Sequence, residues 1–139
     1  MSELGALDAP KPSLRAAPWT RRLILFLRIM AGVSMFKGLY HWSEVCGIIG
    51  AADPFENHSI AWQTATVFFA VIDLVAAVGL WLAAAWGGVV WLTATISMAA
   101  IELFFPQVYG GRIWIALFEF VSLFGYVGLA LMAGRERPD

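Results

Sequence analysis

The stretch LILFLRIMAGVSMFKGLYHWSEVCGII, residues 23–49, decides the fold of this chain. It is long enough to cross a lipid bilayer, because a helix needs about 20 apolar residues to span the hydrocarbon core. It also contains four ionisable residues: Arg28, Lys37, His41 and Glu44. Ionisable groups are costly in hydrocarbon, so they face other protein segments, water or the membrane surface. The stretch therefore predicts a membrane-spanning helix that packs against other helices.

The composition of the whole chain also indicates a membrane protein. Of the 139 residues, 60% are hydrophobic and 14% are charged, and the mean hydropathy is +0.75. A soluble domain has about half apolar and about a quarter charged residues. No basic patch with interleaved aromatic residues is present, so we expect no nucleic-acid partner.

Three further apolar runs follow the first one, and we expect all four to be helices. The expected spans cover residues 23–49, 60–85, 89–105 and 112–133. Strands of a membrane barrel are about 10 residues long and alternate in polarity, which these runs do not. The predicted fold class is therefore all-α: a polytopic membrane protein built as an antiparallel bundle of four transmembrane helices.

The remaining segments are polar or contain helix-breaking residues. Residues 1–18 hold three prolines and scattered charges, so we expect a mobile cytoplasmic tail there. The transmembrane domain is expected over residues 19–134, and residues 135–139 are expected to form a second cytoplasmic tail. The glycine pair at 87–88 predicts a tight turn between the second and third spans. Pro106 predicts the end of the third span, because proline cannot continue the helical hydrogen bonds.

The basic residues predict the orientation. They precede the first span or follow the last one: Lys11, Arg15, Arg21, Arg22, Arg135 and Arg137. The loop at 50–59 has acidic residues and no Lys or Arg. The positive-inside rule then places both termini in the cytoplasm. The seven tryptophans, Trp91 among them, are expected near the two membrane interfaces, as aromatic belts require.

A set of tryptophan, glycine and proline motifs extends over most of residues 20–130. The motifs are Trp62-Gln63, GLWL at 79–82, WGGVVWL at 86–92, Glu102, Phe105-Pro106 and YGGR at 109–112. They resemble those of a family of small four-helix inner-membrane proteins of alphaproteobacteria, which is a domain of unknown function. The resemblance implies the four-helix membrane fold, and it implies no activity and no cofactor.

The ionisable residues inside the spans are predicted to lie in two layers. A helix rises about 1.5 Å per residue, so depth can be estimated by counting from the end of each span. Arg28 and Asp73 share an inner level and form the expected inner pair. Lys37, Glu102 and Glu119 share a level about 20 Å from the cytoplasmic face.

The outer end of the first span extends this second layer. Lys37, His41 and Glu44 recur at helical spacing and form one polar stripe, which Tyr40 borders. His41 is expected to hydrogen-bond to Glu44 or Tyr40, and Glu44 is expected to meet Arg112 at the outer rim. The predicted intramembrane polar cluster consists of Lys37, Tyr40, His41, Glu44, Glu102 and Glu119.

Three functions are compatible with this cluster. The first is a non-enzymatic subunit or assembly factor of a membrane complex, in which buried pairs fix the helix register. Its partners are the lipid bilayer and other membrane subunits or copies of itself. The alternative is a small oligomeric proton-coupled transporter, in which Lys37 neutralises one of Glu102 and Glu119 while the other holds a proton. The third is a quinone- or haem-binding redox subunit that uses residues 40–42.

Catalytic and metal-binding motifs are missing from the sequence. It contains no Ser-His-Asp set, no HExxH and no glycine-rich phosphate loop. Cys46 is the only cysteine, which excludes an intrachain disulfide and a cysteine-based zinc site. His58 lies in a loop, so a bis-histidine haem site at His41 would need a second chain. We expect no enzymatic activity, no metal and no cofactor.

Overall fold

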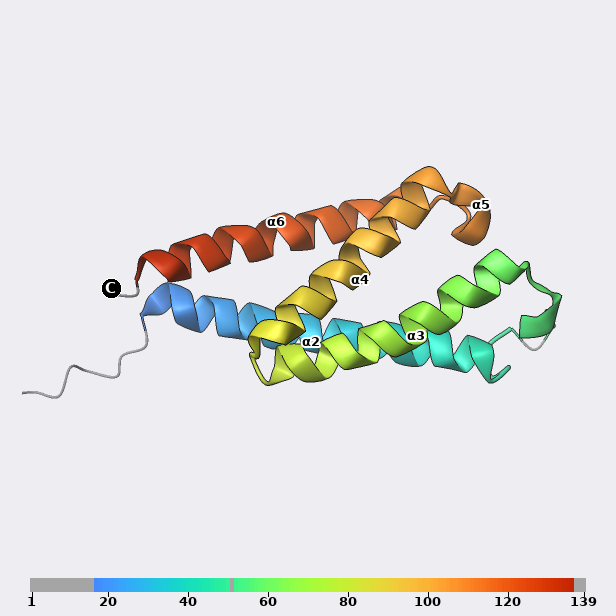
Figure 1. Ribbon diagram of the computed structural model, residues 1–139, viewed down its shortest axis with the longest axis horizontal. Coiled ribbons are helices and arrows are strands. Elements are labelled where there is room, and N and C mark those ends of the chain that lie inside the picture. Colours follow the sequence, from blue (N-terminus) through green and yellow to red (C-terminus); the bar gives the residue numbers. More distant parts are fainter. Residues whose placement is uncertain (1–16, 51, 137–139) are drawn as a thin grey trace, which may run out of the picture.

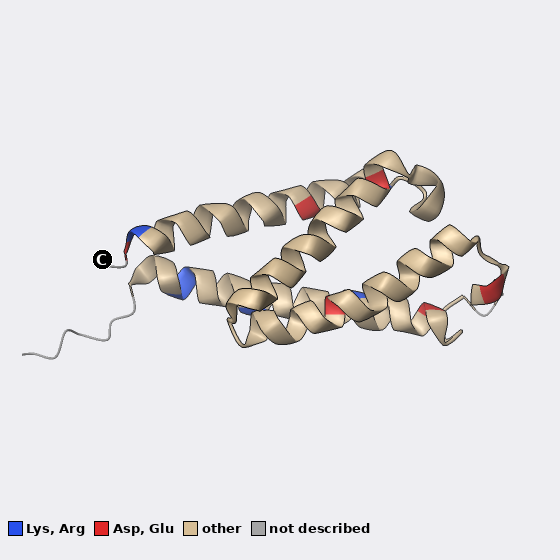
Figure 2. Cartoon of the chain, in the orientation of Figure 1, with Lys and Arg blue, Asp and Glu red and all other residues tan. Residues whose placement is uncertain are grey.

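The computed structural model describes residues 17–50 and 52–136, and all regular secondary structure in this part of the chain is helical. The four long helices are α2 (Pro18–Val45), α3 (Ile60–Trp81), α4 (Ala85–Phe104) and α6 (Ile113–Arg135), and the two short ones are η1 (Phe55–Asn57) and α5 (Pro106–Tyr109) (Figure 1). Each long helix is long and apolar enough to cross a membrane. Charged positions are sparse along these helices (Figure 2). The tail predicted over residues 1–18 lies almost wholly outside the described residues.

The four long helices pack in a closed order. Helix α2 packs along α3, α3 along α4, α4 against α6, and α6 back against α2. The end of α6 lies beside the start of α2, where the backbone N–H groups of Trp19 and Thr20 donate to the Glu136 carboxylate at 3.2 Å. Helices α2 and α6 extend well beyond the connection between α3 and α4 (Figure 1).

Helix α2 begins and ends earlier than the span predicted at 23–49. It begins at Pro18, because proline at the first helical position is already in helical conformation. It ends at Val45, because Gly47 adopts a φ of +69°. The N–H of Ile48 then donates to the Ser43 carbonyl at 2.9 Å, which is the hydrogen bond of a glycine-terminated helix end.

The glycine pair at 87–88 does not form the turn between the second and third spans. The turn lies at 82–84, where Ala83 has a φ of +50° and the N–H of Ala84 donates to the Gly79 carbonyl at 3.0 Å. Gly87 lies instead in the first turn of α4, where it contacts α3. A Cβ added to Gly79 would lie 2.4 Å from the Gly87 Cα, so these glycines permit a close helix crossing.

The third connection contains a short helix where a loop was expected. Helix α4 ends at Phe104, and Pro106 is the first residue of α5. Gly110 and Gly111 follow with φ values of +90° and +60°, which end α5 and turn the chain into α6. Helix α6 reaches Arg135, so it includes the first residue of the predicted tail.

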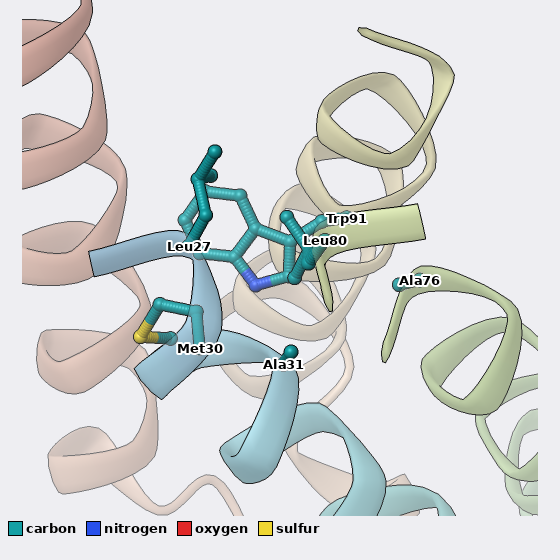
Figure 3. Packing of buried hydrophobic residues seen from close by; sticks show 6 residues of the cluster. All are labelled: Leu27, Met30, Ala31, Ala76, Leu80 and Trp91. Carbon is teal, nitrogen blue, oxygen red and sulfur yellow. The ribbon is translucent and has the colours of Figure 1, made fainter. Parts of the chain in front are cut away.

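The hydrophobic core lies where α2, α3 and α4 meet (Figure 3). Its buried members are Leu27, Met30, Ala31, Ala76, Leu80 and Trp91. The Trp91 indole is 2% exposed and meets the rings of Phe26 and Tyr126 edge-on. Trp91 is therefore buried inside the bundle against α2 and α6, and its level near a membrane interface stays a prediction.

Candidate functional site

A cavity of about 690 Å³ lies between α2, α4, α5 and α6, with α3 contributing at its first turn. Small-molecule sites have volumes of roughly 300–1,000 Å³, so its size is sufficient for a ligand. Its polar lining contains every residue of the predicted intramembrane cluster and Arg112: Lys37, Tyr40, His41, Glu44, Glu102, Arg112 and Glu119. A hollow of about 420 Å³ between α2 and α3 has only apolar lining residues.

Lys37 connects three helices at this cavity. Its ammonium Nζ lies 2.6 Å from Glu119 Oε1 on α6 and 3.9 Å from Asp73 Oδ1 on α3. Both acidic residues are about 1% exposed. The neighbouring Gly38 lets α3 approach α2 at this level, because a Cβ there would lie 2.8 Å from the side chain of Leu74. One ammonium group is thus the shared cation of two buried carboxyl groups.

The partner of Glu102 is a backbone group, whereas Lys37 pairs with Glu119. The Oε2 of Glu102 accepts a hydrogen bond of 2.6 Å from the backbone N–H of Arg112, the residue that precedes α6. A negative charge is favourable at the start of a helix. The Oε1 of Glu102 is buried and has no hydrogen-bond partner among the described residues. Of the two carboxylates that Lys37 was predicted to choose between, it pairs with Glu119, and the turn at 110–111 brings the start of α6 to Glu102.

The expected inner pair of Arg28 and Asp73 does not form. The Arg28 guanidinium lies 5.6 Å from the ring centroid of Trp81, the last residue of α3. The depth estimate placed the inner end of α3 level with the start of α2, whereas α2 extends beyond it (Figure 1). Arg28 precedes Lys37 on α2 by about as many residues as Asp73 precedes Trp81 on α3. Because Arg28 contacts Trp81, Asp73 lies level with Lys37.

The outer part of the cavity holds His41 and Glu44. The His41 Nδ1 lies 3.2 Å from Glu44 Oε2, which is one of the two expected partners of His41. Glu44 and Arg112 both line the cavity, but no ion pair between them occurs among the described residues. Cys46, which follows α2, is exposed and has a free thiol.

Tyr109 lines the cavity, and this position was not predicted from the sequence. Its hydroxyl lies 3.1 Å from the Thr66 hydroxyl, and its ring lies 6.0 Å from the His41 ring. Burial raises the pKa of Tyr109 to about 12. The segment 106–111 is short and contains a proline and two glycines, which is typical of a loop. The aromatic residue between Pro106 and Gly110 is the only sequence feature that indicates an inward-facing side chain. Within residues 17–50 and 52–136, no three His, Cys, Asp or Glu side chains are grouped to hold a metal ion.

Four membrane-length helices around a polar cavity define a multi-pass helical membrane protein. The chain belongs to the family of unknown function DUF6163, whose family model matches residues 21–137. The resemblance of its tryptophan and glycine motifs to an uncharacterised family is thereby confirmed. No curated protein and no solved structure shows a significant match. The cavity is therefore the feature from which a function can be inferred.

Proposed function

We propose that this protein is a non-enzymatic membrane protein that takes up and releases protons at the cavity, as a small oligomeric proton-coupled carrier. The observation that supports this is an imbalance of charge. Four carboxyl groups lie at or beside the cavity, those of Glu44, Glu102, Glu119 and Asp73. Only Lys37 and Arg112 among the lining residues carry a permanent positive charge, and His41 and His58 add positive charge only when protonated. Excess negative charge in a region of low dielectric constant is costly. Protons or a bound cation therefore have to compensate it.

The contacts in the cavity support a compensation by protons that changes when a guest binds. Lys37 cannot fully neutralise Glu119 and Asp73 at once, because its ammonium lies 2.6 Å from one and 3.9 Å from the other. Glu102 receives one backbone N–H on one oxygen. Protons can therefore be held when the cavity is empty and released when a guest supplies positive charge. This exchange is the elementary step of a proton-coupled carrier.

The carrier needs a defined orientation, and we infer an antiparallel bundle in the bacterial inner membrane with both termini in the cytoplasm. The basic residues Arg21, Arg22 and Arg135 at the ends of α2 and α6 support this orientation. The cavity then lies in the outer half of the membrane. Reporter fusions after residue 139 and within loop 50–59 test this topology. A tail and a first loop on the same side of the membrane would contradict it.

Infrared difference spectroscopy of the purified protein between about pH 5 and 9 tests proton handling. The expected result is a carboxylic C=O band that changes with pH and disappears in Glu102→Gln or Glu119→Gln. Glu56→Gln, in η1 outside the cavity lining, is the matched control and should retain the band. A band that is absent or constant at every pH in the wild type would remove the carrier proposal.

The second candidate is a subunit or assembly factor of a membrane complex. It is supported by α6, whose outward face carries the exposed side chains of Val121, Phe124 and Leu131. Such a face suits lipid, another subunit or a second copy of the chain. Native purification with mass spectrometry distinguishes the candidates. Stoichiometric partner proteins support the subunit, whereas the chain alone as a homo-oligomer supports the carrier.

A further inference from the structure

We propose that the cavity binds a hydrophobic organic cation, such as a quaternary ammonium or phosphonium ion or a protonated amine on an apolar body. The inference rests on the proposed proton exchange and names the chemical class of the guest. Two observations support it independently of each other. The first is an incompletely satisfied buried carboxylate, and the second is the aromatic character of the cavity wall.

Glu102 provides the first observation. Its side chain is 4% exposed and lines the cavity, and its Oε1 has no hydrogen-bond partner among the described residues. A buried acceptor without a partner costs free energy, and the cost is greater for a charged group. A cation in the cavity would offset this cost directly. Three carboxyl groups line the cavity against the two permanent positive charges of Lys37 and Arg112, so an anionic guest is disfavoured when the lining histidines are neutral.

The aromatic wall provides the second observation. Six aromatic residues line the cavity: Phe36, Tyr40, Trp62, Tyr109, Trp114 and Phe118. Aromatic faces attract organic cations, and this attraction increases when the cation is desolvated. An inorganic cation instead requires several oxygen ligands that converge on one point. The described residues contain no such grouping, so the wall fits an organic cation better than a metal ion.

The mouth of the cavity fits a guest with an apolar body. Phe36 on α2 is 72% exposed and Trp114 on α6 is 80% exposed, and both line the cavity. These two side chains are exposed edges of the cavity on the first and last helices. A hydrophobic cation can therefore bind with its apolar part against these aromatic residues and its charge toward Glu102.

Charge balance makes the binding depend on pH. The titratable or charged groups that line the cavity are Lys37, Tyr40, His41, Glu44, His58, Glu102, Tyr109, Arg112 and Glu119, and Asp73 lies beside it, near Lys37. At low pH the excess carboxyl groups are protonated and neutral, so they do not attract a cation. The affinity for the cation should therefore rise as the pH rises, with release of protons on binding.

Calorimetry on the full chain in detergent tests the inference, with tetraphenylphosphonium as the probe. Tetraphenylborate has the same shape and the opposite charge, so it separates charge recognition from hydrophobic partition. The expected result is saturable binding of the phosphonium and none of the borate. Glu102→Gln should weaken phosphonium binding by about tenfold, because one negative charge close to the guest is lost.

Arg112→Gln provides the opposite change. Arg112 is exposed and lines the cavity, so removing its positive charge should strengthen phosphonium binding severalfold without loss of folding. A gain of affinity cannot come from a misfolded variant, which keeps the test valid if Glu102→Gln is unstable. Glu56→Gln, outside the cavity lining, should bind like the wild type.

Three results would overturn the inference: no binding of the phosphonium, equal binding of the borate, or affinities that neither cavity variant changes. A titrating carboxyl band without phosphonium binding would leave proton handling intact and remove only the organic cation. Binding of the phosphonium but not of the borate, without a carboxylic C=O band that changes with pH, would support the cation site and contradict the proposed proton exchange.

Discussion

The ammonium group of Lys37 on α2 lies 2.6 Å from a carboxylate oxygen of Glu119 on α6. The two residues are 82 positions apart in the sequence, and Glu119 is 1% exposed. This ion pair connects the first helix with the last one at the wall of the cavity. It is therefore both a structural contact of the bundle and part of the candidate binding site.

Lys37→Met should destabilise the protein in detergent. Asp73 and Glu119 would lose their shared cation, and breaking a buried pair by removing one partner costs on the order of 3–5 kcal/mol. Thermal denaturation measures the effect. The control is Arg28→Met on the same helix, where an exposed guanidinium contacts Trp81 and the expected cost is about 1 kcal/mol or less. Equal melting temperatures for the two variants would show that Lys37 is not needed to neutralise the buried carboxylates.

Gly87→Ala should destabilise the packing of α3 against α4. A Cβ at this position would lie 2.2 Å from the backbone carbonyl carbon of Gly79, so the two helices would have to separate. Overpacking of this kind costs roughly 1–3 kcal/mol. Gly128→Ala on α6 is the matched control, because no atom lies within 4 Å of its added Cβ. That variant should gain about 0.5–1 kcal/mol from helix propensity, so melting temperatures should shift in opposite directions.

The sequence predicted the four helices because each one must contain a long apolar run to cross a membrane. It did not predict their relative depth. Counting residues assumes that all spans share the same inner boundary, whereas α2 extends beyond the end of α3 (Figure 1). Asp73 therefore lies level with Lys37 and not with Arg28. Gly87 was predicted to form a turn. A glycine is favoured both in a tight turn and where two helices pack closely, and the sequence alone does not distinguish these two roles.

The members of the polar cluster could be predicted, but not all their partners. Helical spacing places Lys37, His41 and Glu44 on one stripe, and the structure brings this stripe to the cavity. The partner of Glu102 is a backbone N–H at the start of α6, and its position depends on how the connection after α4 folds. Side-chain periodicity carries no information on such a connection, and Tyr109 was missed for the same reason.

Glu136 should stabilise the start of α2. Its carboxylate accepts hydrogen bonds from the N–H groups of Trp19 and Thr20 at 3.2 Å, which otherwise lack helical partners. Glu136→Ala should cost about 0.5–2 kcal/mol, as the loss of a helix cap does. Hydrogen exchange at Trp19 and Thr20 should accelerate, while Glu56→Ala in η1 should leave it unchanged. Unchanged exchange in Glu136→Ala would mean that water replaces the carboxylate at no cost.

Tyr109 should make the stability of the protein depend on pH in the alkaline range. Burial, supported by the negative charge of Glu44, raises the pKa of Tyr109 to about 12. Its ordinary value is about 10. The unfolded chain therefore loses this proton first, so the contribution of Tyr109 to stability is complete below about pH 10 and is lost as the pH rises through about 12.

Spectrophotometric titration of tyrosinate and denaturation at a series of pH values check this behaviour of Tyr109. Tyr109→Phe should abolish the ionisation step near pH 12 and should lose less stability than the wild type as the pH rises from about 10. It also removes the hydroxyl that bonds to Thr66, so at neutral pH it should be less stable by roughly 0.5–1.5 kcal/mol. The control Tyr40→Phe changes an exposed ring on the same cavity and should retain the step. If the step persists in Tyr109→Phe, then Tyr109 is not the buried phenol and α5 does not close this end of the cavity.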